Sequence, residues 1–247
     1  MKNNHNDIQV LDGVVIKQYS SNERFNCEVK NNRLFKEKGF RVPEVLRIDS
    51  ARLEITFEVI SGLNSLELSH EEIILCLEKL GKIYRCWSNP TTDEEVRDRY
   101  VNIVRQNILD YTNEHNFVTD LAVLDQCLIT LSSDFRASLF KDAKPTNWIF
   151  DSAGVWLIDF DYVKPSFYIA DVMQLLNYQE LTDKSRYEYI EIFHQFISVP
   201  MPRRESILLA GINARIMAMR YNKNLDTYRN DTFIASIKDD LKEIMTI

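Results

Sequence analysis

Apolar residues in the first part of the chain follow a pattern that predicts a β-hairpin. Residues 8–11 and 14–19 are rich in β-branched side chains, and Asp12-Gly13 separates them. Asp-Gly is a dipeptide typical of the two-residue turn between antiparallel strands. We therefore expect two paired strands here.

A helix and a second strand pair follow this hairpin. Ser20-Ser21-Asn22 offers helix-capping side chains ahead of apolar residues at helical spacing, and Gly39 is placed to end the helix. Residues 44–49 and 53–60 form two further β-rich runs. The order up to residue 60 is thus strand, strand, helix, strand, strand.

The pattern becomes helical after Ser61-Gly62. Ser69 and Glu72 have the spacing of a capping box, and the apolar residues that follow them share one helix face. Besides this helix, we expect helices at residues 93–114, 120–131, 171–176, 182–197, 205–221 and 232–245.

A second hairpin is predicted within this helical region. Two short apolar runs, residues 148–150 and 155–158, flank the turn-forming sequence Asp-Ser-Ala-Gly, and Asp159 follows the second run. A hairpin between helices is unusual, so it restricts the possible folds.

Composition and charge limit the classes of protein to consider. The 247 residues carry a formal net charge of −7, which argues against a broad nucleic-acid-binding surface. The four cysteines form no CxxC pair or Cys/His cluster, so we expect reduced thiols rather than disulfides or a zinc site. Because no apolar run has the length of a membrane span, we expect a cytoplasmic protein that binds neither membranes nor nucleic acid.

Polar residues around the second hairpin suggest magnesium chemistry. Asp142 and Asn147 precede the hairpin, and a two-stranded hairpin should bring Asn147 close to Asp159. Carboxylate and amide oxygens are the hard ligands that Mg²⁺ prefers, and Asp142 is placed to accept a proton from an attacking hydroxyl. Taken singly, each of these residues also fits an ordinary polar loop.

The sequence DAKPTN, followed by a hairpin and IDFD, resembles the catalytic loop and metal-binding segment of kinase-fold phosphotransferases. The likeness is to the aminoglycoside phosphotransferase and choline kinase group, where an aspartate then begins a helix, here Asp171. The resemblance implies that Asp142 is the catalytic base, that Asn147 and Asp159 hold Mg²⁺, and that Asp171 braces the catalytic loop. Asp161 stands where choline-kinase-like members often have an acidic residue that supports the metal or the substrate.

The same resemblance extends to the N-terminal strands and helix. Lys17 looks like the lysine that positions the ATP phosphates, and Glu28 looks like the helix glutamate that pairs with it. Glu58, Val59 and Ile60 match the hinge, where backbone groups would meet the adenine.

These likenesses imply an α+β, protein-kinase-like bilobal fold, with a small β-rich N-lobe containing one helix and a mostly helical C-lobe containing the catalytic hairpin. Residues 1–62 would form the nucleotide-binding lobe, and residues 63–247 the lobe with the acceptor site. The implied activity is transfer of the γ-phosphoryl group from ATP, with Mg²⁺, to a hydroxyl of a small molecule such as an amino alcohol, a sugar or an aminoglycoside. The choice between ATP and GTP, the acceptor and the oligomeric state are open.

Two departures from the family pattern keep other functions open. Phe140 stands where the family has a histidine, and no G-x-G-x-x-G precedes Lys17, so the loop that covers the phosphates is shortened, glycine-free or absent. The alternative is a pseudokinase that serves as a binding or regulatory module. A protein kinase fits less well, because only eleven residues separate Asp159 from Asp171.

Several further side chains are interpreted as structural. Arg215 and Arg220 lie on predicted helices that build the acceptor pocket in this fold, and either could bind an anionic acceptor, but a solvated helix face is our interpretation of both. Tyr84, Trp87 and Trp148 could line a pocket, and we interpret them as core residues.

Overall fold

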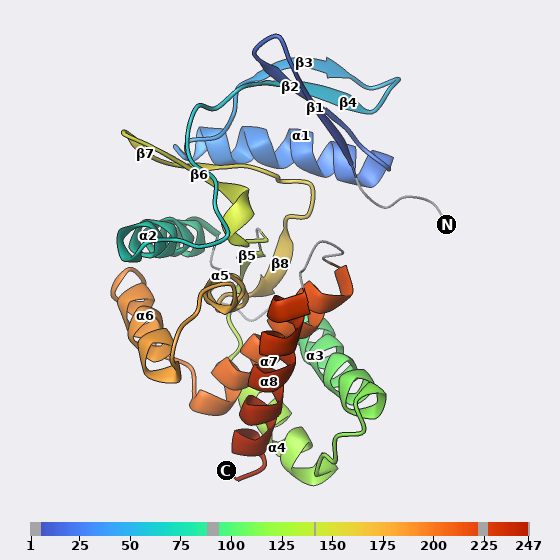
Figure 1. Ribbon diagram of the computed structural model, residues 1–247, viewed down its shortest axis with the longest axis vertical. Helices are drawn as coiled ribbons and strands as arrows, with labels where there is room; N and C mark the ends of the chain where they lie inside the picture. The colour runs from blue at the N-terminus through green and yellow to red at the C-terminus, as the bar shows by residue number, and fades with distance from the viewer. Residues whose placement is uncertain (1–5, 88–93, 141, 222–226, 247) are drawn as a thin grey trace. The chain divides into compact units, whose positions relative to one another are not determined.

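The computed structural model describes residues 6–87, 94–140, 142–221 and 227–246 (Figure 1). The chain divides into two compact units: residues 1–76 with 141–164, and residues 77–140 with 165–247. The predicted second hairpin therefore belongs to the same unit as the N-terminal strands. The functional division at residue 62, into a nucleotide-binding and an acceptor-binding lobe, stays a prediction.

The first unit contains the two strand pairs that the sequence predicts, joined in one antiparallel sheet of order β1-β2-β4-β3. Leu11 pairs with Val14, so the first turn has two residues, Asp12 and Gly13, with φ angles of 50° and 78°. Positive φ at both positions is the geometry that Asp-Gly favours. The turn leaves no room for a covering loop between the first two strands. The strands are β1 (Asp7–Leu11), β2 (Val14–Gln18), β3 (Val45–Asp49) and β4 (Glu54–Glu58).

Helix α1 (Asn22–Glu37) packs against this sheet, as predicted. The hydroxyl of Ser21 caps it by accepting a hydrogen bond from the backbone N–H of Arg24, and Gly39 follows its end with a φ of 73°. The core between helix and sheet consists of buried Tyr19, Phe25, Ile55 and Phe57.

The second predicted hairpin is confirmed as β6 (Trp148–Asp151) and β7 (Gly154–Leu157), with Asp151 paired to Gly154. A single 3₁₀ turn, η1 (Pro145–Asn147), precedes it and was not predicted. The segment after β4 reaches this hairpin, because Leu63 forms an antiparallel bridge with Phe150. The hairpin is therefore anchored within the first unit.

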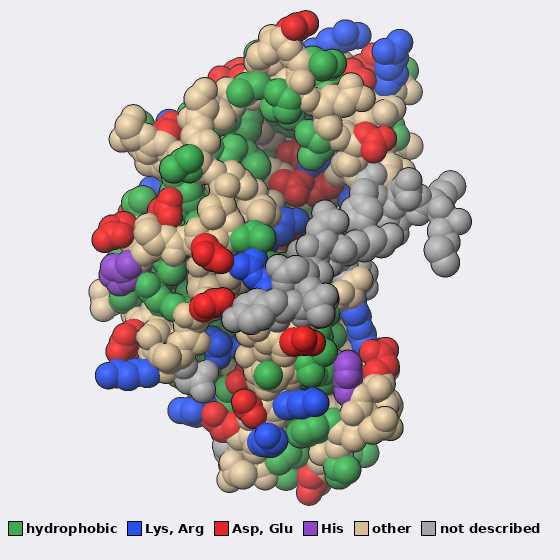
Figure 2. All heavy atoms as spheres, viewed as in Figure 1, with side chains coloured by type: hydrophobic (Ala, Val, Ile, Leu, Met, Phe, Trp, Pro, Cys, Tyr) green, Lys and Arg blue, Asp and Glu red, His purple; other side chains and the backbone are tan. Residues whose placement is uncertain are grey.

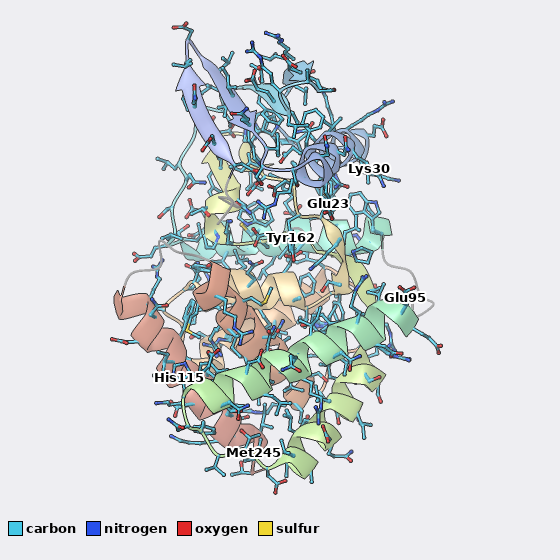
Figure 3. The ribbon with its side chains drawn as sticks, turned by 90° about the vertical axis from the view of Figure 1, so that its right-hand side faces the viewer. Glu23, Lys30, Glu95, His115, Tyr162 and Met245 are labelled. Atoms are coloured by element: carbon cyan, nitrogen blue, oxygen red, sulfur yellow. The ribbon has the colours of Figure 1, made fainter. Side chains whose placement is uncertain are left out.

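The second unit is mostly helical, as predicted, and α7 packs against α3, α4, α5 and α8. Figure 3 shows α3 running between the labelled residues Glu95 and His115. A short strand pair, β5 with β8, was not predicted. The predicted capping box is present at the start of α2, where Ser69 and Glu72 exchange hydrogen bonds. The elements are α2 (His70–Trp87), α3 (Glu94–Glu114), α4 (Leu121–Asp134), β5 (Ala137–Phe140), β8 (Lys164–Phe167), α5 (Ala170–Asn177), α6 (Asp183–Gln195), α7 (Arg204–Tyr221) and α8 (Thr227–Ile244), of which α2 and β8 begin in the first unit.

Arg215 is not on a solvated face, and this interpretation of the sequence was wrong. Its side chain is 1% exposed, and Nη1 lies 2.5 Å from Asp240 Oδ2. The reason is that α7 is covered by other helices, and α8 supplies the opposite charge. Arg220 is exposed, in agreement with its interpretation, and donates to Asn107 Oδ1 at 2.7 Å.

The other structural interpretations can be compared with burial. Tyr84 and Trp148 are buried, whereas Trp87 is half-buried. All four cysteines are free thiols, as expected. Among the described residues, no helix is long and apolar enough to cross a membrane.

Candidate active site

Lys17 is a buried lysine that points from β2 into the interior of the first unit. Its side chain is 8% exposed, and Nζ donates to Glu28 Oε2 at 2.8 Å and to Asp159 Oδ1 at 2.5 Å. Burial lowers the pKa of Lys17, but the carboxylates of Glu28, Asp159 and Asp161 outweigh this and raise it above its ordinary value. The ammonium is therefore charged whenever these carboxylates are ionised.

Glu28 holds Lys17 from the inner face of α1. Its Oε2 accepts from Lys17, and its Oε1 accepts from the backbone N–H of Phe160 at 3.1 Å, so both oxygens are engaged. Glu23 and Lys30, on the same helix, are exposed (Figure 3). Glu28 thus forms with Lys17 the ion pair that the resemblance implies.

Asp159 and Asp161 flank Phe160 just after β7. Asp159 has a φ of 67°, in the left-handed region that aspartate tolerates better than most residues, and its side chain is 30% exposed. The carboxylate of Asp161 is more buried and accepts from Asn6 Nδ2 at 2.6 Å, with Arg24 Nη1 at 3.6 Å. Burial, together with the negative charge of Asp159, raises the pKa of Asp161 to about 6.

The predicted catalytic loop is held by Asn147. The buried amide of Asn147 donates to the carbonyl of Asp142 at 2.7 Å and to its Oδ2 at 3.2 Å. Lys144 Nζ lies 3.1 Å from the same carboxylate oxygen. Asp142 itself has a φ of 66°. Two contacts therefore fix the direction of the Asp142 carboxylate on a short, left-handed segment.

The β6–β7 hairpin brings Asn147 next to Ile158, the residue before Asp159. The carbonyl of Asn147 accepts from the backbone N–H of Ile158 at 3.1 Å. The two side chains contact different groups, however, because Asn147 reaches Asp142 and Asp159 reaches Lys17. Their sharing of one metal ion stays a prediction.

Three carboxylates of the first unit have the chemistry of a divalent-cation site. One oxygen each from Glu28, Asp159 and Asp161 lies within 4.8 Å of the other two. Such hard oxygen donors suit Mg²⁺. Lys17 and Arg24 lie beside these carboxylates, so three negative charges face two positive ones among these five described residues. Figure 2 shows acidic and basic side chains close together in a hollow of the face that it draws.

The predicted hinge residues and Asp171 lie away from the Lys17 cluster in their contacts, and their roles stay predictions. Glu58 ends β4 and accepts from the backbone N–H of Glu44, and Val59 and Ile60 follow it. Asp171 is buried in the first turn of α5, in the second unit, so its bracing role stays a prediction. Phe140 stands where the family has a histidine, and its side chain is outside the part that the structure describes.

Two residues near Asp161 were missed by sequence reasoning. Asn6 contacts Asp161 across 155 positions and shows no local signal. Arg24 did have a local signal in the sequence: it precedes Glu28 by four residues, so both side chains lie on the same helix face.

Comparisons with known proteins show the fold. No family model matches the chain, and no curated protein sequence matches it. Among solved structures, choline kinase LicA from Streptococcus pneumoniae is similar with a TM-score of 0.65 and 15% identity, covering 98% of this chain and 90% of that one.

Two aminoglycoside phosphotransferase structures are also similar. The GDP complex of aminoglycoside 2'-phosphotransferase-IIIa has a TM-score of 0.64 and 12% identity, covering 96% of this chain and 89% of that one. ADP-bound aminoglycoside phosphotransferase APH(2'')-Ib has a TM-score of 0.56 and 13% identity, covering 98% and 94%. The chain therefore has the protein-kinase-like fold of the aminoglycoside phosphotransferase and choline kinase structures.

Proposed function

We propose that this protein is a phosphotransferase that uses ATP and Mg²⁺ to phosphorylate a hydroxyl group of a small molecule. The observation that carries the proposal is the buried Lys17, held by Glu28 and Asp159 in a group of three carboxylates. A lysine held this way positions phosphates, and acidic groups beside it suit the accompanying metal ion. Choline kinase and aminoglycoside phosphotransferases, which share the fold, motivate the choice of a small-molecule acceptor.

The side chains would divide the work of phosphoryl transfer. Asp142, with its carboxylate fixed by Asn147 and Lys144, orients the acceptor hydroxyl and accepts its proton. Lys17 holds the α- and β-phosphates. Asn147 and Asp159 would hold Mg²⁺, which when bound neutralises charge on the phosphate oxygens.

Other residues would support this arrangement from a distance. Glu28 keeps Lys17 in place, and Asp161 adds negative charge beside the proposed metal ligands. The backbone of Glu58, Val59 and Ile60 would meet the adenine, and Asp171 would brace the catalytic loop. Catalysis would come mainly from positioning and charge neutralisation.

A pseudokinase is the second candidate, and the turn between β1 and β2 favours it. That turn has two residues and replaces any loop at this place that could close over the phosphates. Such a protein would bind a partner or a nucleotide without transferring the phosphoryl group.

Substitution of the proposed base and metal ligand separates these functions. We expect Asp142→Ala to lower the transfer rate by about 100- to 10,000-fold, as for loss of a general base. Asp159→Ala should abolish the Mg²⁺-dependent reaction. Asp231→Ala, an exposed aspartate on α8, is the matched control and should keep full activity. The assay follows ATP turnover with amino alcohols, sugars and aminoglycosides, and melting temperatures verify folding.

Full activity in either site variant would contradict the mechanism. A wild-type protein that binds ATP with Mg²⁺ but transfers phosphate to no acceptor of the panel, including water, would favour the pseudokinase.

A further inference from the structure

A short segment after the predicted hinge lies directly on β6. A methyl group added to Gly62 would lie 2.5 Å from the carbonyl oxygen of Phe150, so this close approach requires glycine. Leu63 and Phe150 exchange two backbone hydrogen bonds of 2.9 Å each. The segment therefore pairs with the edge of the hairpin that β7 does not use.

The side chain of Asn64 continues this pairing beyond the backbone bridge. Its Nδ2 donates to the carbonyl of Thr146 at 2.8 Å and to the carbonyl of Trp148 at 2.9 Å. These carbonyls belong to the residues immediately before and after Asn147. A primary amide has two N–H donors, so Asn64 uses both of them on the backbone that carries the proposed metal ligand.

We propose that Asn64 is a positioning residue that fixes Asn147 for metal binding. The inference rests on the proposed function, in which Asn147 holds Mg²⁺. Asn147 is already tied at its own carbonyl by Ile158 and at its own N–H by Lys144. Asn64 binds the carbonyls of the residues before and after Asn147, so the peptide planes on both sides of Asn147 are held as well.

Loss of Asn64 would free these peptide planes without removing a metal ligand. The carbonyls of Thr146 and Trp148 would then bond to water, and Asn147 would sample more orientations. Partners that hold a metal ligand typically contribute about 10- to 100-fold to metal affinity. Because Asn64 is exposed, its removal leaves no cavity, and the fold should persist.

A magnesium titration tests the proposal. The melting temperature is followed at fixed ATP while Mg²⁺ is varied, for the wild type, Asn64→Ala, Asn64→Ser, Asn147→Ala and the control Asn113→Ala, an exposed asparagine on α3. We expect the Mg²⁺ midpoint of Asn64→Ala to rise about tenfold. Asn64→Ser, which keeps one donor, should fall between it and the wild type. ATP affinity in EDTA and the unliganded melting temperature should match the control.

Each other result overturns the proposal in a distinguishable way. A wild-type midpoint in Asn64→Ala, beside a raised midpoint in Asn147→Ala, would reject the positioning role and leave the proposed function standing. So would a lower unliganded melting temperature with an unchanged midpoint, because that outcome marks a purely structural residue. An unchanged midpoint in Asn147→Ala would remove the metal role of Asn147 and, with it, the premise of the inference.

Discussion

The first unit buries Lys17 among three carboxylates, whereas the second unit buries Arg215 against one carboxylate, Asp240. Arg215 is 1% exposed, and its pair is balanced in charge. In the Lys17 group, three carboxylates face two cations, Lys17 and Arg24, among the described residues, and Asp159 is 30% exposed. A buried, one-to-one ion pair therefore indicates a structural role, whereas a partly exposed group with more carboxylates than cations is what the proposed Mg²⁺ site requires.

The largest effect should come from breaking the balanced pair. Arg215→Met should lower the free energy of unfolding by about 3–5 kcal/mol, because it removes the guanidinium that faces the buried Asp240 carboxylate. The double variant Arg215→Met with Asp240→Leu should recover most of this loss. Urea unfolding measures both. A loss below about 1 kcal/mol in the single variant would show that this pair is not structural.

Lys17→Met should destabilise the metal-free protein by about 2–3 kcal/mol, somewhat less than a fully buried pair, because water reaches Asp159. Millimolar Mg²⁺ should raise the melting temperature of this variant more than that of the wild type. In the variant, the ion would meet the same three carboxylates without the competing Lys17 ammonium. Arg215→Met is the control, and Mg²⁺ should raise its melting temperature no more than that of the wild type, because its Lys17 cluster is unchanged. Equal responses of the two variants would remove the distinction between the two regions.

Asp161 gives the first unit a characteristic pH dependence. Its raised pKa, about 6, means that the folded state takes up a proton that the unfolded state, with a pKa near 4, does not. This contribution to stability is full below pH about 4 and disappears as the pH rises through about 6. Without Mg²⁺, Asp161→Asn should therefore flatten the pH dependence of unfolding between pH 5 and 7. Chemical denaturation across this range measures it, and an unchanged slope would contradict the raised pKa of Asp161.

His194 should give the second unit a smaller dependence of opposite sign. Burial lowers the pKa of His194, and its Nδ1 lies 3.2 Å from the carbonyl of Val199. The folded state thus resists protonation, and stability is lost as the pH falls below the unfolded value, about 6.5. His194→Gln should weaken this loss between pH 7 and 5.5 in a melting-temperature series. If the melting temperature of the variant fell more steeply as the pH is lowered, the contribution of His194 would have the opposite sign and the prediction would be wrong.

The sequence predicted those elements whose signals are local. Asp12-Gly13 specified its turn, Ser69 and Glu72 specified a helix start, and short apolar runs on either side of turn-forming residues specified both hairpins. The β5 and β8 pair was missed because each strand has four residues, β8 contains Pro165, and they pair across a long separation. Arg215 was misinterpreted because its partner lies 25 residues away on another helix.

The candidate site also contains residues that the sequence indicated and residues that it did not. The resemblance supplied Lys17 and Glu28, and the structure places them in contact, although their catalytic roles stay predictions. Asn6 and Asn64 could not be found from the sequence. An exposed or terminal asparagine has no helical or strand periodicity, and its meaning depends on which distant carbonyl or carboxylate it meets.

The most direct measurement is a thermal shift of the wild type and Asp159→Asn with ATP, in the presence and absence of Mg²⁺. At ATP 100-fold above its dissociation constant, binding stabilises the native state by about 2.7 kcal/mol. For a chain of this size, that corresponds to a rise of about 5–10 °C. We expect this rise in the wild type with Mg²⁺ and a much smaller one in Asp159→Asn. No rise in the wild type, or an equal rise in both proteins, would contradict a metal-nucleotide site at the Lys17 cluster.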